Sequence, residues 1–245
     1  SGSSVNEGIF YGGFGNYLSA IDTKDGTLLW KNQDWNGGEG TVSSHMVAGN
    51  TLITGSNWRS LYGHDKHTGK MIWEQSGEGL RFRSSTPVYV SDTLFVCAQQ
   101  ALVKIDPESG HIFQVLPVPY DLQTAASPIV TEKLFILGTS REGLSAFDRK
   151  DMKEIWNVKT GPSLIYTAPY SKPYSSTVES SPACMGNNIV FGASDGYLYF
   201  VDCESGQVIQ KIEIGAPILG DILVLGDKIY TADFSGNVSC FQIQH

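Results

Sequence analysis

Short apolar runs alternate with small polar turns along the whole chain. Runs such as 51–54, 93–96, 133–136, 188–191 and 228–231 are bounded by Gly, Asn or Asp every eight to ten residues. This pattern is typical of antiparallel strands joined by tight turns. No stretch sustains the apolar period of a helix. The sequence therefore predicts an all-β protein built as an antiparallel meander.

The strands recur as a unit of about 42 residues. An aspartate returns, at spacings of 43, 41, 42 and 54 residues, as Asp22, Asp65, Asp106, Asp148 and Asp202. A glycine follows four residues later at Gly26, Gly69, Gly110 and Gly206, with Met152 in the fourth copy. A tryptophan follows eight residues after the aspartate at Trp30, Trp73 and Trp156, with Gln114 and Gln210 in the other two copies. Asp accepts backbone N–H bonds in turns and Gly adopts positive φ without steric cost, so we assign these residues to turn and packing roles.

Each unit divides into four strands, which we name A to D; the Asp ends strand C and the Trp lies on strand D. Four-stranded units that cannot bury their own faces stack radially, which predicts a β-propeller of about six four-stranded antiparallel blades. We expect one domain over 1–245, with blades at about 1–34, 41–77, 83–117, 124–160, 179–215 and 220–245. The first unit has only a stub of strand A at 3–5, and the last has no strand D. We expect the stub to complete the last blade; an incomplete ring is the alternative.

Composition narrows the choice of partners. Of 245 residues, 41% are hydrophobic, which is enough for a core, and the net charge is −8. A nucleic-acid partner needs clustered Lys and Arg, so the charge argues against one. No apolar run approaches the length of a membrane span. Because the chain opens on Ser-Gly-Ser-Ser in the middle of a repeat, we expect it to be excised from a larger protein.

Cysteines and histidines offer no metal motif. Cys97, Cys184, Cys203 and Cys240 lack CxxC spacing, and we expect Cys97, Cys184 and Cys240 to be buried free thiols, with a disulfide left open. His64 and His67 fall beside Asp65, and we interpret both as turn residues. The stretch from Asp22 to Gly26 lacks the alternating third oxygen ligand of a calcium loop.

The repeat resembles the PQQ-like repeat of quinoprotein dehydrogenases and of the BamB-type outer-membrane assembly lipoprotein. Two strong matches are Gly196-Tyr-Leu-Tyr-Phe-Val-Asp202-Cys-Glu-Ser-Gly206 and the segment from Leu18 to Trp30. The resemblance covers essentially the whole chain and implies a β-propeller, but it says little about function. Quinoprotein dehydrogenases use eight blades, an adjacent Cys-Cys disulfide, a stacking Trp and a calcium ion. This chain has about six blades and no adjacent cysteines, so we expect neither PQQ nor calcium.

The residues that break the repeat indicate where function lies. In a propeller the D–A crossings and B–C turns emerge on one face, and loops held by a rigid scaffold commonly carry function. A roughly 12-residue insertion within 161–178, which accounts for the spacing of 54, lengthens the fourth D–A crossing. Aromatic and arginine side chains, which are enriched at contact sites, gather in these loops. We predict a contact face made by Trp35, Trp58, Arg59, Arg81, Arg83, Arg141, Tyr166, Tyr170 and Tyr174. That the insertion only plugs the channel is the open alternative.

These observations favour a non-catalytic scaffold whose loop face binds a protein partner or another domain of the parent chain, or else a glycan or peptide. No HxH or HExxH spacing is present and no glycine-rich loop precedes a helix, so we expect no enzyme. We expect an extracytoplasmic location, either periplasmic with a possible lipid anchor or secreted. Two alternatives stay open: a C-terminal accessory domain of a secreted hydrolase such as a metallophosphoesterase, and a degenerate quinoprotein dehydrogenase.

Overall fold

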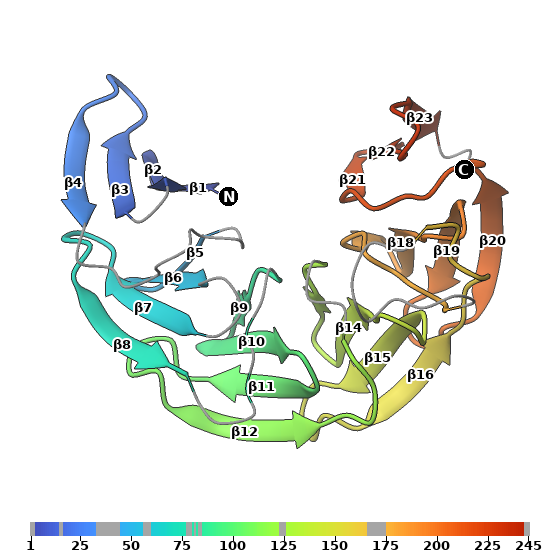
Figure 1. Ribbon diagram of the computed structural model, residues 1–245, viewed down its shortest axis with the longest axis horizontal. Coiled ribbons are helices and arrows are strands. Elements are labelled where there is room, and N and C mark those ends of the chain that lie inside the picture. The colour runs from blue at the N-terminus through green and yellow to red at the C-terminus, as the bar shows by residue number, and fades with distance from the viewer. Residues whose placement is uncertain are drawn as a thin grey trace. The chain divides into compact units, whose positions relative to one another are not determined.

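The computed structural model describes residues 3–14, 17–32, 45–55, 60–76, 80, 82, 85–122, 126–165 and 175–242. They belong to two compact units, Ser1–Pro117 and Val118–His245. Every regular element among the described residues is a β-strand, and neighbouring strands of each sheet pair antiparallel (Figure 1). The all-β prediction is confirmed. No described element is a helix long and apolar enough to cross a membrane.

The first unit contains three four-stranded sheets whose strands neighbour one another in chain order. The first sheet consists of β1 (Ser3–Asn6), β2 (Ile9–Phe14), β3 (Tyr17–Asp22) and β4 (Leu28–Asn32). The second consists of β5 (Met46–Ala48), β6 (Thr51–Gly55), β7 (Leu61–Asp65) and β8 (Met71–Gln75). The third consists of β9 (Val88–Val90), β10 (Thr93–Ala98), β11 (Ala101–Ile105) and β12 (Ile112–Pro117).

The second unit repeats this plan in its described residues. The fourth sheet consists of β13 (Ile129–Val130), β14 (Leu134–Gly138), β15 (Leu144–Asp148) and β16 (Glu154–Val158). The fifth consists of β17 (Ala183–Met185), β18 (Asn188–Gly192), β19 (Tyr197–Asp202) and β20 (Val208–Glu213). The sixth consists of β21 (Leu223–Leu225), β22 (Lys228–Ala232) and β23 (Val238–Gln242).

The N-terminal stub belongs to its own sheet. β1 pairs with β2 from Ser3↔Gly12 to Asn6↔Ile9, so the prediction that this segment completes the last blade is wrong. The reason is the two-residue turn between the strands, where Glu7 has φ 49° and Gly8 has φ 77°. Two successive residues at positive φ form the hairpin turn that matches the twist of paired strands. The turn fixes β1 beside β2, because the chain reverses at once.

The C–D turns are built alike. In the third sheet, Asp106 Oδ1 accepts the Glu108 N–H at 2.8 Å, and the Gly110 N–H donates to the Asp106 carbonyl at 2.9 Å. Gly110 has φ 72°, the left-handed conformation that the turn requires. In the fourth sheet Met152 takes this position at φ 62°. The repeated Asp thus satisfies backbone donors that no strand pairs.

The tryptophan of one sheet packs on the C–D turn of the next. The Trp73 ring lies against Gly110, where an added Cβ would come within 2.6 Å of it, and Trp73 Nε1 donates to the Pro107 carbonyl at 2.9 Å. Two further pairs repeat this contact: Trp30 with Gly69 and the Lys66 carbonyl, and Trp156 with Gly206 and the Cys203 carbonyl. Each ring therefore links two sheets by apolar contact and by one hydrogen bond.

Two expectations about buried residues are corrected. Cys97 is a buried free thiol, but Cys184 and Cys240 are exposed. Cys184 lies on the short strand β17 and Cys240 on β23 of the three-stranded sixth sheet, where less structure covers them.

His64 is not a turn residue: it lies in β7, opposite Leu52, and is fully buried. His67 is exposed in the turn.

Candidate functional site

The loop face comprises the D–A crossings and the B–C turns, which lie at the same end of the strands within each unit. Of the nine predicted contact residues, the structure describes only Arg141. The others lie outside the described residues: Trp35, Trp58, Arg59, Arg81, Arg83, Tyr166, Tyr170 and Tyr174. Their grouping into one contact face therefore stays a prediction.

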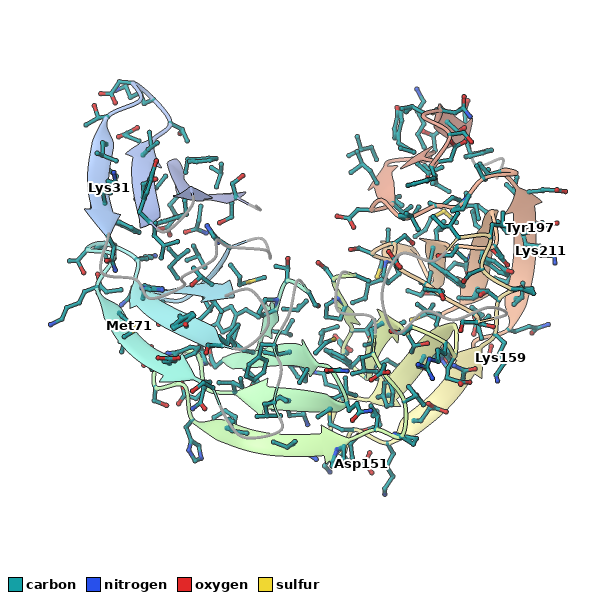
Figure 2. The ribbon with its side chains drawn as sticks, viewed as in Figure 1. Lys31, Met71, Asp151, Lys159, Tyr197 and Lys211 are labelled. Atoms are coloured by element: carbon teal, nitrogen blue, oxygen red, sulfur yellow. The ribbon has the colours of Figure 1, made fainter. Side chains whose placement is uncertain are left out.

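Arg141 lies in the B–C turn of the fourth sheet, between β14 and β15. Its guanidinium is 3.9 Å from the Asp121 carboxylate, and its side chain is 35% exposed. The next residue, Glu142, forms an ion pair with Lys159, whose Nζ lies 2.9 Å from the Glu142 carboxylate (Lys159 in Figure 2). Arg141 thus lies beside a neighbouring carboxylate, and its side chain is partly exposed.

The described end of the insertion is hydrogen-bonded to the B–C turn of the fourth sheet. The Ser176 N–H donates to the Arg141 carbonyl at 3.1 Å, and the Gly143 N–H donates to the Ser176 carbonyl at 2.7 Å. Val178 N–H donates to the Thr139 carbonyl at 3.1 Å. These bonds fix where the insertion rejoins the sheet beside Arg141.

The other end of the insertion is held by the fifth sheet. Asp195, in the B–C turn between β18 and β19, accepts the Gly161 N–H at 2.7 Å and the Tyr199 hydroxyl at 2.6 Å. Burial raises the pKa of Tyr199, and its hydrogen bond to the Asp195 carboxylate raises it further. The phenol therefore remains a hydrogen-bond donor at neutral pH, and it anchors the start of the insertion.

Tyr120 forms a second anchored phenol in the described part of the third D–A crossing. Its hydroxyl bonds to the Glu154 carboxylate and lies 3.3 Å from the Ser145 hydroxyl. Burial is the main cause of its raised pKa, followed by the bond to Glu154. This geometry supports a structural role for Tyr120, since the hydroxyl is already occupied by protein groups.

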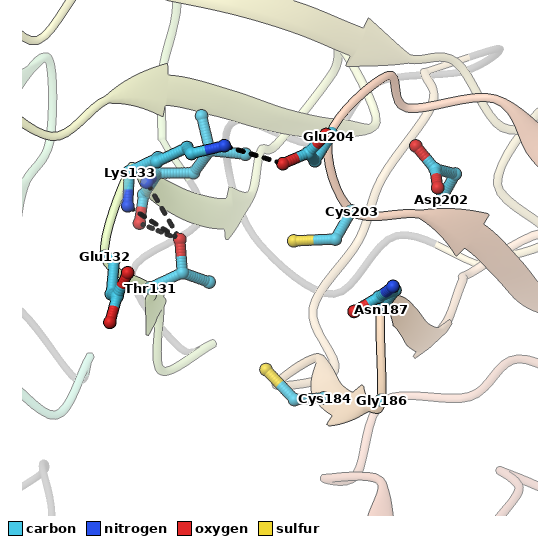
Figure 3. A pocket seen from close by; sticks show the side chains of 10 residues that line it. Thr131, Glu132, Lys133, Cys184, Gly186, Asn187, Asp202, Cys203 and Glu204 are labelled. Carbon is cyan, nitrogen blue, oxygen red and sulfur yellow. Dashed lines mark hydrogen bonds and ion pairs between the residues drawn. The ribbon is translucent and has the colours of Figure 1, made fainter.

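A cavity of about 450 Å³ lies at the opposite end of the strands, between the fourth and fifth sheets (Figure 3). It is lined by the A–B turns of both sheets and by the C–D turn of the fifth: Thr131, Glu132, Lys133, Leu134, Cys184, Gly186, Asn187, Asp202, Cys203 and Glu204. Lys133 Nζ lies 2.8 Å from the Glu204 carboxylate across the cavity rim. The repeat pattern gave no signal for this cavity, because its walls are ordinary turn residues.

The cavity walls carry two thiols, those of Cys184 and Cys203 (Figure 3). Cys184 lies on β17 and Cys203 just beyond the end of β19, with β18 between these strands, so the two Cα atoms are at least about two strand spacings apart, roughly 9–10 Å. A disulfide needs Cα atoms within about 7 Å, and both thiols are free. Partial desolvation of each sulfur, which extends to Cys184 although that residue is exposed as a whole, raises the pKa of both thiols and keeps them in the weakly nucleophilic thiol form.

The described residues contain no group of three or more His, Cys, Asp or Glu side chains placed to hold a metal ion. The carboxylates that the repeat brings together bind their own turns: Asp22 Oδ1 accepts the Lys24 N–H at 2.8 Å, and Asp25 Oδ1 accepts the Thr27 N–H at 2.9 Å. The described part of the loop face therefore offers hydrogen-bonding groups and the partly exposed side chain of Arg141.

Sequence comparison identifies relatives along most of the chain. A family model described as outer membrane protein assembly factor BamB matches residues 14–85 and 59–245. BamB of Shewanella oneidensis is 21% identical over 275 residues, which cover 94% of this chain and 68% of that protein. Across five curated BamB relatives, this chain spans between 48% and 68% of their length. The predicted resemblance to PQQ-like, BamB-type repeats is confirmed.

Solved structures share the fold. BamB from Moraxella catarrhalis matches with a TM-score of 0.65 at 15% identity, over 100% of this chain and 83% of that one. The Pan2 WD40 domain of Neurospora crassa matches with a TM-score of 0.66 at 11% identity, over 100% of this chain and 79% of that one. Together with the six described sheets, these likenesses confirm the predicted β-propeller fold.

Proposed function

The chain belongs to the family of outer membrane protein assembly factor BamB, and from this membership we propose that it is a non-catalytic scaffold for outer membrane protein assembly. The observation that carries the proposal is the family match, which extends from residue 14 to residue 245. Its partner is a protein of the assembly machinery, and its place of work is the periplasmic side of the outer membrane. Neither PQQ nor calcium takes part.

We place the partner contact on the loop face. The insertion within 161–178 is the largest departure from the repeat, and hydrogen bonds at both of its described ends support it on rigid sheets. Such support lowers the entropy that a loop loses on binding. Arg141 adds a partly exposed guanidinium beside the insertion, and Arg is enriched among residues that dominate protein interfaces.

The experiment compares two triple variants of the full chain. Trp58, Arg81 and Tyr170 are replaced by Ala on the loop face. In the control, Lys24, His67 and Glu108 are replaced by Ala at the C–D turns, where all three are exposed. Each tagged protein is isolated from envelopes of cells that produce it, and the associated assembly proteins are quantified by mass spectrometry.

The loop-face variant is expected to lose at least about tenfold of the associated protein, because a handful of aromatic and Arg residues carries most interface energy. The control variant is expected to retain it, and both are expected to keep the wild-type melting temperature. Equal retention by both variants would contradict the loop-face assignment. Absence of assembly proteins from the wild-type isolate would contradict the scaffold function itself.

A further inference from the structure

Three polar residues of the second sheet stand at positions where most of the other described sheets carry an apolar residue or proline. His64, opposite Leu52 at the end of β7, occupies the position held by Ile21, Ile105, Phe147 and Val201. Thr54, two residues along β6, occupies the position of Val96, Leu137 and Phe191; the first sheet has Gly12 there and the sixth has Thr231. His45, just before β5, occupies the position of Pro87, Pro128 and Pro182; the first sheet has Ser3 there and the sixth has Ile222. Among the described sheets, only the second carries a polar residue at all three positions.

All three side chains are buried on the sheet face that packs against the first sheet. His64 is 0% exposed, Thr54 is 1% exposed and His45 is 2% exposed. Thr54 Oγ1 lies 3.2 Å from His64 Nε2. Leu52, on the same face as His64, packs with Tyr11 and Ala20 of the first sheet. These polar groups therefore form a layer inside an apolar contact between two sheets.

The layer is incompletely hydrogen-bonded. Both ring nitrogens of His45 are buried without a hydrogen-bond partner, and so is Ser4 Oγ on β1. Ser4 lies opposite Tyr11 in the β1–β2 pair, so it points toward the second sheet. A buried polar group without a partner costs about 1–3 kcal/mol. The contact between these two sheets is consequently weaker than an all-apolar one.

We propose that this layer of His45, Thr54 and His64 is a proton-sensitive joint: it holds the first sheet to the second while both imidazoles are neutral, and it opens when they are protonated. The first sheet then separates from the second before the other sheets of the unit unfold. Buried imidazolium ions in an apolar contact carry the desolvation cost of a charge, which the open joint relieves by returning both rings to water.

The direction and size of the pH effect on opening follow from the pKa values of the two histidines. Burial lowers the pKa of His45 and of His64 from 6.5 to about 4, and for His64 the neighbouring His45 adds to the lowering. Between pH 6.5 and 4 the two imidazoles are therefore protonated in the open joint and neutral in the closed joint. The closed form loses stability relative to the open form as the pH falls through this window. Between pH 7 and pH 5 the opening constant is expected to rise about 20-fold for one histidine and about 500-fold for two.

The charged groups around the layer are already engaged. Lys66 Nζ lies 3.3 Å from the Glu7 carboxylate. Asp65 Oδ1 accepts the Thr68 hydroxyl at 2.8 Å, which is the main cause of the lowered pKa of Asp65, and also the Thr68 and His67 N–H groups, which lower it further. The phenols facing the layer are Tyr11, whose pKa is raised, mainly by burial, and Tyr62, whose ring centre lies 6.2 Å from that of His64.

Hydrogen–deuterium exchange tests the joint in the full chain. Exchange is measured at pH 7 and pH 5, corrected for the intrinsic rate, in peptides from β2–β3 and β6–β7, with β10–β11 as reference. In the wild type, lowering the pH from 7 to 5 is expected to raise the opening constant of the first two sheets by about two orders of magnitude more than that of the third sheet. A variant with the repeat residues His45→Pro and His64→Ile is expected to lose this difference.

Matched variants keep the test decisive. Exposed His67 and His111 replaced by Gln should leave the wild-type pH response intact. If the double variant does not fold, His64→Val alone should reduce the response about 20-fold. The proposal is overturned if the wild type shows no excess opening at pH 5, or if the histidine variants keep it. It is also overturned if Glu7→Gln abolishes the response, because the Glu7–Lys66 ion pair would then be its source.

Discussion

A methyl group added at Gly110 tests the contact by which tryptophan links neighbouring sheets. Gly110 and Gly26 hold the same place in the C–D turn, with φ 72° and 77°, and each N–H donates to the carbonyl of its turn Asp at 2.9 Å. They differ in one respect. A Cβ on Gly110 would lie 2.6 Å from the Trp73 ring, whereas nothing lies within 4 Å of one on Gly26. Gly26→Ala is therefore a matched control within the same unit.

The magnitudes separate the two effects. Both substitutions place alanine in the left-handed region, at a cost of about 1–2 kcal/mol. Gly110→Ala must also displace the Trp73 ring, and overpacking of this kind costs about 1–3 kcal/mol. Loss of the Trp73 Nε1 bond to the Pro107 carbonyl adds about 1 kcal/mol. We expect about 1–2 kcal/mol for Gly26→Ala and about 3–6 kcal/mol for Gly110→Ala.

Urea unfolding followed by circular dichroism gives the free energy of unfolding of each variant. A second substitution, Trp73→Leu, is expected to reduce the difference between Gly110→Ala and Gly26→Ala, because the obstructing ring is gone. Equal destabilisation by the two alanine variants would refute the reasoning, since it would leave backbone conformation as the whole effect.

Three further predictions concern other contacts. Trp156→Phe removes the bond to the Cys203 carbonyl and is expected to lower the free energy of unfolding by about 1–2 kcal/mol in the same assay, with unchanged circular dichroism. Tyr199→Phe removes the hydroxyl bound to Asp195 and is expected to cost about 1 kcal/mol and to speed proteolytic cleavage within the insertion; unchanged cleavage would show that this bond does not hold its base. Addition of PQQ and calcium is expected to leave both the absorption spectrum and the melting temperature unchanged, and a thermal shift would contradict the absence of a cofactor.

The sequence predicted the strands and sheets because the repeat supplies the same signals several times. Short apolar runs, a turn aspartate and a glycine four residues after it recur in successive copies, so a weak signal in one unit is reinforced by the others. The polar stub at 3–5 lacked that apolar signal, yet it forms β1. The turn at Glu7 and Gly8 was the signal that could have placed this strand beside β2. The same kind of two-residue turn with positive φ joins β9 to β10 at Ser91 and Asp92.

The candidate site was less predictable from sequence. Spacing located the insertion, but not the bonds of Asp195 and Ser176 that hold its ends, because these join turns of different sheets. His64 was assigned to the turn because it precedes Asp65, although strand C runs through that Asp. Pairing with Leu52 decides its burial, and pairing partners in different strands are not visible in local sequence.

The most direct test of the loop-face scaffold is site-specific photo-crosslinking in living cells. A photoreactive amino acid is placed at Tyr170 in the insertion or, as the control, at Lys24 in an exposed C–D turn. Adducts are then identified by mass spectrometry. The account predicts an adduct between Tyr170 and a protein of the outer membrane assembly machinery, with none at Lys24. Adducts at Lys24 and none at Tyr170 would contradict it.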